Sequence, residues 1–151
     1  KALQHLITNA MKYTPDGREI FVRTELREMA DGGAGVVVIV QDTGIGVDPD
    51  QHELIFEKFY QVGDSKTHSS GQTSFKGGGP GMGLAIVKGV AEAHGGQTWV
   101  ESEKHDEEAL PGSTFYLLLP VEAREPHTQN NDTLRMDRPL FTRSDGQKPT
   151  D

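Results

Sequence analysis

Two glycine-rich turns constrain the fold of this chain more than any other feature of its sequence. Residues 42–46 (Asp-Thr-Gly-Ile-Gly) follow an apolar run at positions 36–40, and residues 77–83 (Gly-Gly-Gly-Pro-Gly-Met-Gly) precede a helical pattern. Glycine permits backbone angles and close approaches that a Cβ would block. A helix N-terminus also presents free N–H groups and the positive end of its dipole, so the second turn favours phosphate binding.

The composition indicates a soluble globular protein of ordinary domain size. The 151 residues are 34% hydrophobic and 25% charged, and the formal net charge is -8 at pH 7. Its 15 Lys and Arg residues are scattered, which disfavours nucleic-acid binding, because phosphate contacts need a clustered basic face. The chain has no Cys and therefore no disulfide framework, so a cytoplasmic location is expected. The longest aliphatic run, at 36–40, is far shorter than the ~20 residues that a membrane helix needs.

The domain organisation is predicted from changes along the chain. We expect one domain over residues 1–120 and a polar, disordered C-terminal tail over 121–151, where prolines are spread among polar residues. The chain begins at Lys1, without an initiator Met and already inside a helical pattern. We therefore expect a fragment of a longer protein, and a membrane anchor elsewhere in that protein is compatible with this sequence.

Hydrophobic periodicity predicts a domain that contains both helices and strands. We expect Asp48 to cap a short helix and Pro49 to occupy its first position. The expected elements are an amphipathic helix over 2–13, a half-exposed strand over 20–27, a central strand over 36–41, the short helix over 52–60, a mobile loop over 62–78, a second helix from Gly83 to the Gly95-Gly96 pair, and hairpin strands over 98–102 and 113–119.

The polar arc of the first helix carries candidate nucleotide contacts. Asn9 is the candidate metal ligand, because Mg²⁺ keeps most of its waters and needs few oxygen ligands from a protein. Lys12 lies about one turn further along, where its ammonium could contact a phosphate. Tyr13 could cover a base or sugar. Each residue also has a simpler interpretation, namely a solvated polar side chain or an aromatic ring that closes the helix end.

Asp42 is the candidate for base recognition. It stands where the buried strand ends and the turn with Gly44 and Gly46 begins, so its carboxylate could accept a hydrogen bond from the amino group of adenine. The two glycines would let the backbone approach the ring. The alternative is an ordinary turn that ends a strand.

The second glycine turn is the candidate for phosphate binding. Gly79, Gly81 and Gly83 do not form a dinucleotide fingerprint, because Leu84 occupies the place of the third glycine and no strand precedes them. No Gly-Lys-Ser/Thr motif of a Walker loop is present either. The turn could equally be a flexible hinge, and a lid over a nucleotide needs such hinges.

These residues resemble the ATP-binding catalytic domain of sensor histidine kinases, within the group that includes DNA gyrase, the Hsp chaperones and MutL. The resemblance covers the chain from its start to Pro120. It rests on four ordered segments that look like the N box (6–15), the first glycine box (42–46), the F box (55–60) and the second glycine box (79–84). It implies a two-layer α/β sandwich of the Bergerat type in the α+β class, with helices on one face of a mixed sheet.

The resemblance also implies an activity, cofactors and partners. It implies ATP with Mg²⁺ under a mobile lid, and transfer of the γ-phosphate to a histidine in an upstream dimerisation domain that this chain lacks. A response regulator would receive the phosphate next, and the full-length protein would be a homodimer. The residues implied to bind the cofactor are Asn9, Lys12, Tyr13, Asp42, Gly44, Gly46, Phe59, Gly79, Gly81, Met82, Gly83 and Leu84, with Asn9 at the metal and with Phe56 and Phe59 anchoring the lid.

Two positions depart from the family pattern. His5 stands where the family often has Asn, and an imidazole is a poorer Mg²⁺ ligand than an amide oxygen. Gln61 stands where Arg is frequent, which weakens the case for efficient transfer. Three functions therefore remain open: a histidine kinase module, a nucleotide-binding or scaffold module without transfer, and a gyrase- or chaperone-type ATPase. His5 disfavours the last, because those ATPases carry a Glu there to activate water.

Overall fold

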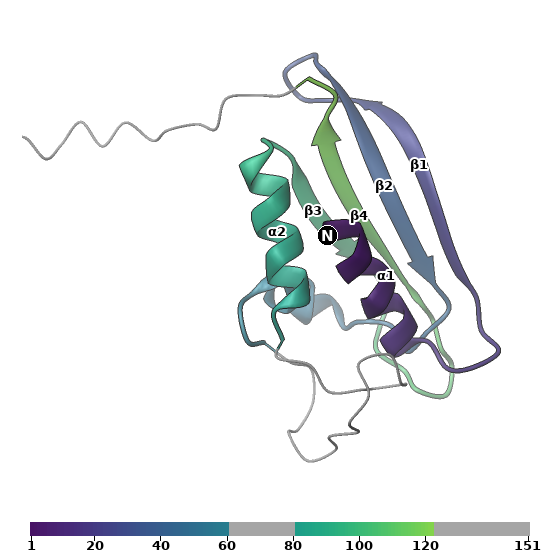
Figure 1. The fold of residues 1–151 in the computed structure, drawn as a ribbon. Coiled ribbons are helices and arrows are strands. Elements are labelled where there is room, and N and C mark those ends of the chain that lie inside the picture. Colours follow the sequence, from purple (N-terminus) through teal and green to yellow (C-terminus); the bar gives the residue numbers. More distant parts are fainter. Residues whose placement is uncertain (61–80, 123–151) are drawn as a thin grey trace, which may run out of the picture.

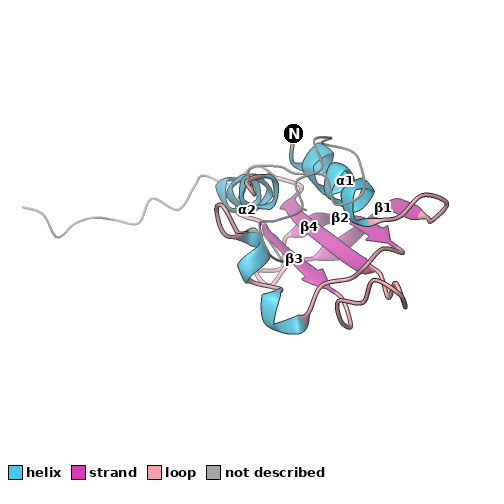
Figure 2. Ribbon diagram, turned by 90° about the horizontal axis from the view of Figure 1, so that it is seen from below, coloured by secondary structure: helices cyan, strands magenta, loops and turns pink. Residues whose placement is uncertain are grey.

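The computed structural model of the protein describes residues 1–60 and 81–122, which form a sheet with helices on one face (Figures 1 and 2). The predicted α+β sandwich is confirmed. The predicted loop over 62–78, most of the predicted tail, Gln61 and Gly79 lie outside the described residues. The elements in chain order are α1 (Ala2–Tyr13), β1 (Ile20–Glu28), β2 (Ala34–Asp42), the 3₁₀ turns η1 (Pro49–Gln51) and η2 (Leu54–Phe56), α2 (Gly83–Ala93), β3 (Gln97–Glu101) and β4 (Ser113–Pro120).

The sheet has the strand order β1-β2-β4-β3, and all three pairings are antiparallel. This differs from the expected mixed sheet. Short connections join β1 to β2 and β3 to β4, and such hairpins produce only antiparallel neighbours. The long connection through α2 does give β2 and β3 the same direction, but β4 lies between them. The last strand of the described residues, β4, is therefore an interior strand of the sheet.

The main core lies between the helices and the sheet. Leu6 and Ala10 of α1 and Val87 and Ala91 of α2 are fully buried there. Phe115 of β4 packs in the same cluster. Burying a Leu, Val or Phe side chain contributes about 1.5–3 kcal/mol to the free energy of folding, so these contacts hold the helices against the sheet.

A second cluster covers the other face of the sheet and explains why the run at 36–40 is continuously apolar. Val37 and Ile39 of β2 are buried on this face, whereas Val40 is buried on the helix side. Trp99 and Tyr116 close the cluster with parallel rings whose centroids are 4.7 Å apart. Strand β2 is thus buried on both faces, as its sequence predicts for a central strand.

The segment after β2 is less regular than predicted. In place of a helix over 52–60 the chain forms the two 3₁₀ turns η1 and η2. Asp48 caps neither turn with its side chain, because its Oδ1 accepts a hydrogen bond of 2.8 Å from the backbone N–H of His105. At the far end Phe59 adopts a positive φ of 65°, which a continuing helix does not allow. Long-range contacts therefore override the local helix signals.

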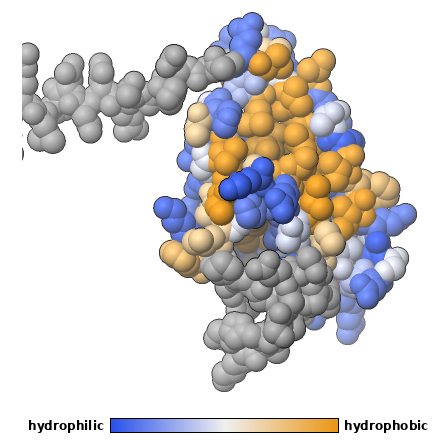
Figure 3. Space-filling view, in the orientation of Figure 1, coloured by the Kyte–Doolittle hydropathy of each residue, from blue (hydrophilic) through white to orange (hydrophobic). Residues whose placement is uncertain are grey.

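The helices leave part of the sheet uncovered. Strand β1 is an edge strand, and Leu26 on its helix side is 81% exposed, beside the half-exposed Val22. Leu3 and Met11 of α1 are also exposed. Figure 3 shows the resulting apolar surface as a broad orange area over the sheet above α1. Among residues 1–60 and 81–122, no helix is long and apolar enough to span a membrane.

Leucine truncations at a buried and at an exposed position should have very different effects on stability. Leu6→Ala should lower the free energy of unfolding by about 2–5 kcal/mol, because it leaves a cavity in the core. The matched control Leu26→Ala should change it by less than about 0.5 kcal/mol, because Leu26 is exposed. Urea unfolding followed by circular dichroism measures both values. Similar losses in the two variants would contradict the described core.

Candidate functional site

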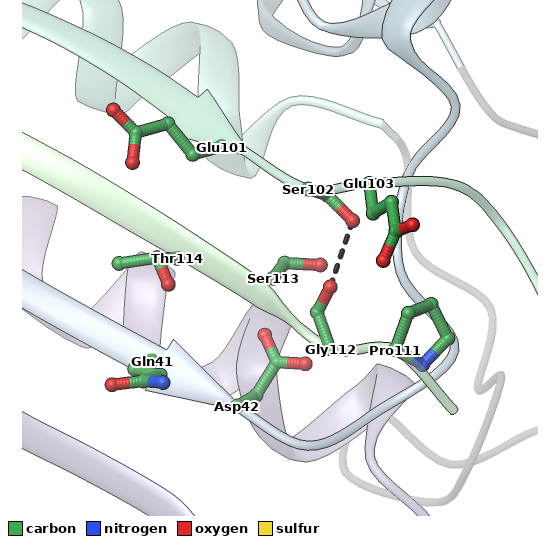
Figure 4. Close-up of a pocket in the computed structure, with 9 residues that line it drawn as sticks. All are labelled: Gln41, Asp42, Glu101, Ser102, Glu103, Pro111, Gly112, Ser113 and Thr114. Atoms are coloured by element: carbon green, nitrogen blue, oxygen red, sulfur yellow. Dashed lines mark hydrogen bonds between the residues drawn. The ribbon is translucent and has the colours of Figure 1, made fainter. Parts of the chain in front are cut away.

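Asp42 ends strand β2 and turns its carboxylate toward β4. It is only 4% exposed, and its Oδ1 accepts a hydrogen bond of 2.9 Å from the backbone N–H of Gly44. Burial raises the pKa of Asp42 to about 6, against the opposing effect of hydrogen bonds from the backbone N–H groups of Gly44 and Ser113. Figure 4 shows the carboxylate directed toward Ser113. The site thus contains a buried, directed hydrogen-bond acceptor, as base recognition requires.

Ser113 belongs to this site, although sequence reasoning gave it no role. It is buried, and it is the register partner of Asp42 across the β2–β4 pair. Directly opposed residues of an antiparallel pair share a face, so the two side chains lie next to each other. The sequence predicted a strand over 113–119, but it did not indicate that this strand pairs with the one that ends at Asp42.

The glycines of the first turn are required by contacts within the protein. A Cβ on Gly44 would collide with the carbonyl oxygen of Tyr13. The same oxygen accepts a hydrogen bond of 3.1 Å from the backbone N–H of Ile45. Gly46 has a φ of +76°, and a Cβ there would meet the carbonyl of Lys104. The turn is therefore clamped between the end of α1 and the β3–β4 connection. Sequence reasoning explained these glycines by approach to a nucleotide ring, whereas these contacts are internal.

The polar arc of α1 meets the start of α2 at His5. Lys12 lies over the Tyr13 ring, with Nζ 5.0 Å from the ring centroid. One face of His5 borders Gly83, where an added Cβ would lie 3.4 Å from the imidazole Nδ1. Asn9 follows His5 by four residues and so lies on the same side of α1. The candidate metal ligand and the N-terminus of α2 therefore share one region.

The second glycine turn is joined to the F-box segment. The N–H of Phe59 donates a 3.0 Å hydrogen bond to the carbonyl of Gly81, and the φ of Gly81 is +66°. Phe59 is 70% exposed, and Met82 is also exposed, whereas Leu84 packs against the core. These outer side chains therefore lie at the rim of the region, while the backbone of residues 81–83 lies closer to α1.

The candidate residues gather at one edge of the molecule. Figure 1 shows the C-terminal ends of α1 and β2 and the N-terminal end of α2 at the same lower edge. Tyr13, Asp42 and Gly44 form one connected group, and His5 and Gly83 form the other. A buried carboxylate, a lysine, an amide side chain and the N-terminal N–H groups of an 11-residue helix lie at this edge. This combination can bind a purine nucleotide and its phosphates.

A separate hollow opens next to Asp42 on the side of the β3–β4 connection (Figure 4). It has a volume of about 350 Å³ and is lined by Gln41, Asp42, Glu101, Ser102, Glu103, Pro111, Gly112, Ser113 and Thr114. Two of its carboxylates, on Glu101 and Glu103, would repel a polyphosphate. This hollow is therefore a poor site for phosphates. In the described ranges, no group of three or more His, Asp or Glu side chains is arranged to hold a metal.

The fold and this edge together define a nucleotide-binding α+β sandwich that uses no Walker loop. Residues 1–123 match the family described as "Histidine kinase-, DNA gyrase B-, and HSP90-like ATPase", and the chain belongs to this family. The predicted resemblance is thereby confirmed, and the family binds ATP.

Curated relatives are sensor kinases. The chain is 40% identical over 138 residues to the autoinducer 2 sensor kinase/phosphatase LuxQ of Vibrio vulnificus (strain YJ016), a match that covers 91% of this chain and 15% of LuxQ. It is 34% identical over 146 residues to the sensor-like histidine kinase SenX3 of Mycobacterium tuberculosis (strain ATCC 25618 / H37Rv), covering 89% of this chain and 32% of SenX3. The chain thus spans a minor part of each relative.

Solved structures give the same result. The mycobacterial sensor histidine kinase MprB matches with a TM-score of 0.58 and 30% identity, covering 79% of this chain and 67% of that one. Full-length ShkA in complex with AMPPNP matches with a TM-score of 0.58 and 30% identity, covering 82% of this chain and 21% of ShkA.

Replacing Asp42 should stabilise the protein at neutral pH. The folded-state pKa of about 6 exceeds the ordinary Asp pKa of 3.8, so the folded state binds more protons between these values and loses stability as pH rises through them. At pH 7.5 the free energy of unfolding of Asp42→Asn should therefore exceed that of wild type by about 1–3 kcal/mol, because one pKa unit corresponds to about 1.4 kcal/mol. The gain should shrink toward zero near pH 3.5. Urea titrations across this pH range measure it.

The matched control for this titration is Asp16→Asn, because Asp16 is exposed. It should show neither the gain at pH 7.5 nor its dependence on pH. A wild type that is more stable than Asp42→Asn at pH 7.5 would contradict the raised pKa.

Proposed function

We propose that the chain is the catalytic domain of a two-component sensor histidine kinase, which transfers the γ-phosphate of ATP to a histidine in an upstream dimerisation domain absent from this chain. The observation that carries the proposal is the buried Asp42 carboxylate, which lies at the same edge as the N-terminus of α2. The sensor-kinase names of LuxQ and SenX3 support it. A response regulator would accept the phosphate next, and the full-length protein would act as a homodimer.

Each part of the edge has a role in this proposal. Asp42 accepts the hydrogen bond of the adenine amino group, and guanine, which presents a carbonyl there, is rejected. Asn9 supplies an amide oxygen to Mg²⁺, which takes its other ligands from phosphates and water. Lys12 and the N–H groups at the start of α2 bind phosphate. The AMPPNP bound to ShkA supports an adenine nucleotide as the ligand of this fold.

The residues of α1 favour transfer over hydrolysis. An ATPase needs a general base that activates water, and α1 contains neither Asp nor Glu in its sequence ALQHLITNAMKY. His5 takes the position next to the first residue of α2. The carboxylate base with which gyrase- and chaperone-type ATPases activate water is thus missing from α1, which favours transfer to a histidine acceptor over hydrolysis.

Calorimetric titration with AMPPNP and Mg²⁺ tests the site. Asp42→Ala should weaken binding about 10- to 100-fold, because a hydrogen bond to a charged group contributes about 1.5–3 kcal/mol. Asn9→Ala should remove most of the gain in affinity that Mg²⁺ gives. Asp16→Ala, which changes an exposed carboxylate on the turn after α1, is the control and should bind as wild type does. Equal affinity in all four proteins would refute the site.

Labelled ATP tests the class of reaction. The isolated chain should bind Mg²⁺-ATP without labelling itself, because none of its six His residues stands in the sequence context of a phosphoacceptor. Addition of the histidine-bearing domain should produce acid-labile, base-stable label on that domain. Stable label on a histidine of this chain would sink the assignment, and steady release of inorganic phosphate would favour the ATPase alternative.

A further inference from the structure

The hydroxyl of Ser102 connects three parts of the chain beside Asp42. Ser102 directly follows β3 and is half-buried. Its Oγ accepts a hydrogen bond of 2.9 Å from the backbone N–H of Val47, just after the first glycine turn. The same hydroxyl donates a hydrogen bond of 2.7 Å to the carbonyl of Gly112, just before β4 (Figure 4), whereas the carbonyl of Lys104 is 3.5 Å away. The end of β3, the first glycine turn and the start of β4 thus meet at one oxygen atom.

The bond to Gly112 reaches Asp42 through a single peptide group. The carbonyl of Gly112 and the N–H of Ser113 belong to the same peptide, and that N–H donates a hydrogen bond to Asp42. Because a peptide group is planar, its C=O and its N–H keep opposite directions and rotate together. A hydrogen bond to the C=O also polarises the peptide and strengthens the N–H as a donor. Ser102 therefore fixes both the direction and the strength of one donor to Asp42.

Gly112 is also bonded to the residue that supplies the other donor to Asp42. The N–H of Gly44 donates a hydrogen bond of 2.9 Å to Oδ1 of Asp42, and the carbonyl of Gly44 accepts one of 2.9 Å from the N–H of Gly112. Ser102 holds Gly112 on one side and Val47 on the other. Both donors to the carboxylate therefore depend on the position of Gly112, which the Ser102 hydroxyl sets.

We propose that Ser102 is a positioning residue for base recognition, because its hydroxyl keeps the Asp42 carboxylate in the direction in which it accepts the adenine amino group. The inference rests on the proposed function, which takes Asp42 as the contact to the base. Hydrogen bonds weaken steeply as they depart from linearity, so a small rotation of the carboxylate reduces the preference for adenine. Ser102 acts through the peptide before Ser113 and not on the nucleotide itself.

Thr98 provides a matched comparison on the same pair of strands. Its Oγ1 donates a hydrogen bond of 2.7 Å to the carbonyl of Tyr116, so it too links a β3 hydroxyl to a β4 carbonyl. Tyr116 pairs with Ile39, which lies three residues before Asp42 on β2. The bonds made by Thr98 and Ser102 have the same length and the same chemical groups. They differ in that only the bond of Ser102 leads to Asp42.

The donors that Ser102 positions affect the charge of Asp42 as well as its direction. Burial raises the pKa of Asp42, and the N–H groups of Gly44 and Ser113 lower it. The other carboxylates that line the adjacent hollow, on Glu101 and Glu103, are negatively charged and offer no donor. Weakening the Ser113 donor should therefore raise the pKa of Asp42 further, and this change can be measured without a nucleotide.

Carboxyl ¹³C NMR titration of the nucleotide-free chain tests the positioning role directly. Ser102→Ala should raise the pKa of Asp42 above its wild-type value of about 6, and Asp42→Asn identifies the signal. Ser102→Thr keeps the hydroxyl and should restore the wild-type pKa. The matched control Thr98→Ala removes a hydroxyl bond of the same length and should leave the pKa unchanged. Both alanine variants should lose stability in urea, so stability alone does not separate them.

Calorimetric titration with Mg²⁺ and either AMPPNP or GMPPNP at pH 7.5 tests the effect on recognition. Ser102→Ala should bind AMPPNP about three- to tenfold more weakly, the range that one hydrogen bond between neutral groups contributes. Its weaker affinity for GMPPNP should not change, because guanine presents a carbonyl to Asp42, so the preference for adenine falls by the same factor. Thr98→Ala and Ser102→Thr should bind both nucleotides as wild type does.

The outcomes separate the positioning role from the proposed function. An unchanged Asp42 pKa with unchanged AMPPNP affinity in Ser102→Ala would overturn the positioning role and leave the kinase assignment intact. A raised pKa with unchanged AMPPNP affinity would overturn the assignment of Asp42 to the base and this proposal with it. Equal weakening of AMPPNP in Ser102→Ala and Thr98→Ala would reduce Ser102 to a general structural role and overturn the proposal.

Discussion

The placement of one carboxylate organises the functional end of the molecule. Asp42 accepts backbone hydrogen bonds from Gly44 and Ser113, and those donors belong to different parts of the chain. Gly44 can take its position only because it has no Cβ to strike Tyr13, and Gly112, with a φ of +80°, packs its Cα against the carbonyl of Asp42. The end of α1, the first glycine turn and the start of β4 are therefore held together around a single buried oxygen acceptor.

Structural features that depend on residues close together in the sequence could be predicted. Features that depend on contacts between residues far apart in the sequence could not. Periodicity identified the helices α1 and α2, and the uninterrupted apolar run identified β2 as central, because burial on one or both faces leaves a local pattern. The role of Ser113 and the 3₁₀ turns escaped prediction. Asp48 illustrates the reason, since its carboxylate bonds an N–H 57 residues away and not the nearby turn. The grouping of Asn9, Asp42 and Gly83 came from the family resemblance, and the roles given to them remain predictions.

Helix α2 joins the core to the candidate site. Its inner face completes the core through Val87 and Ala91, and its N-terminus borders His5 of α1. An ion pair of 2.8 Å between Lys88 and Glu57 links its side to the F-box segment that contains Phe59. Because one helix makes all of these contacts, the core, the F-box segment and the α1–α2 edge keep a fixed geometry relative to one another.

The interior position of β4 has a consequence for how the chain is made. Residues 113–120 pair with β2 on one side and β3 on the other. The β1–β2 hairpin and β3 therefore cannot join into one sheet until β4, the last described strand, has been synthesised. Until then the β1–β2 hairpin has no partner for its inner edge, and α1 has no complete surface to pack on. Such dependence on late, non-local pairing slows folding and leaves apolar strands exposed in the nascent chain. Folding of this domain is therefore expected to begin only after β4 has left the ribosome, and a chain cut before residue 113 would be a substrate for chaperones.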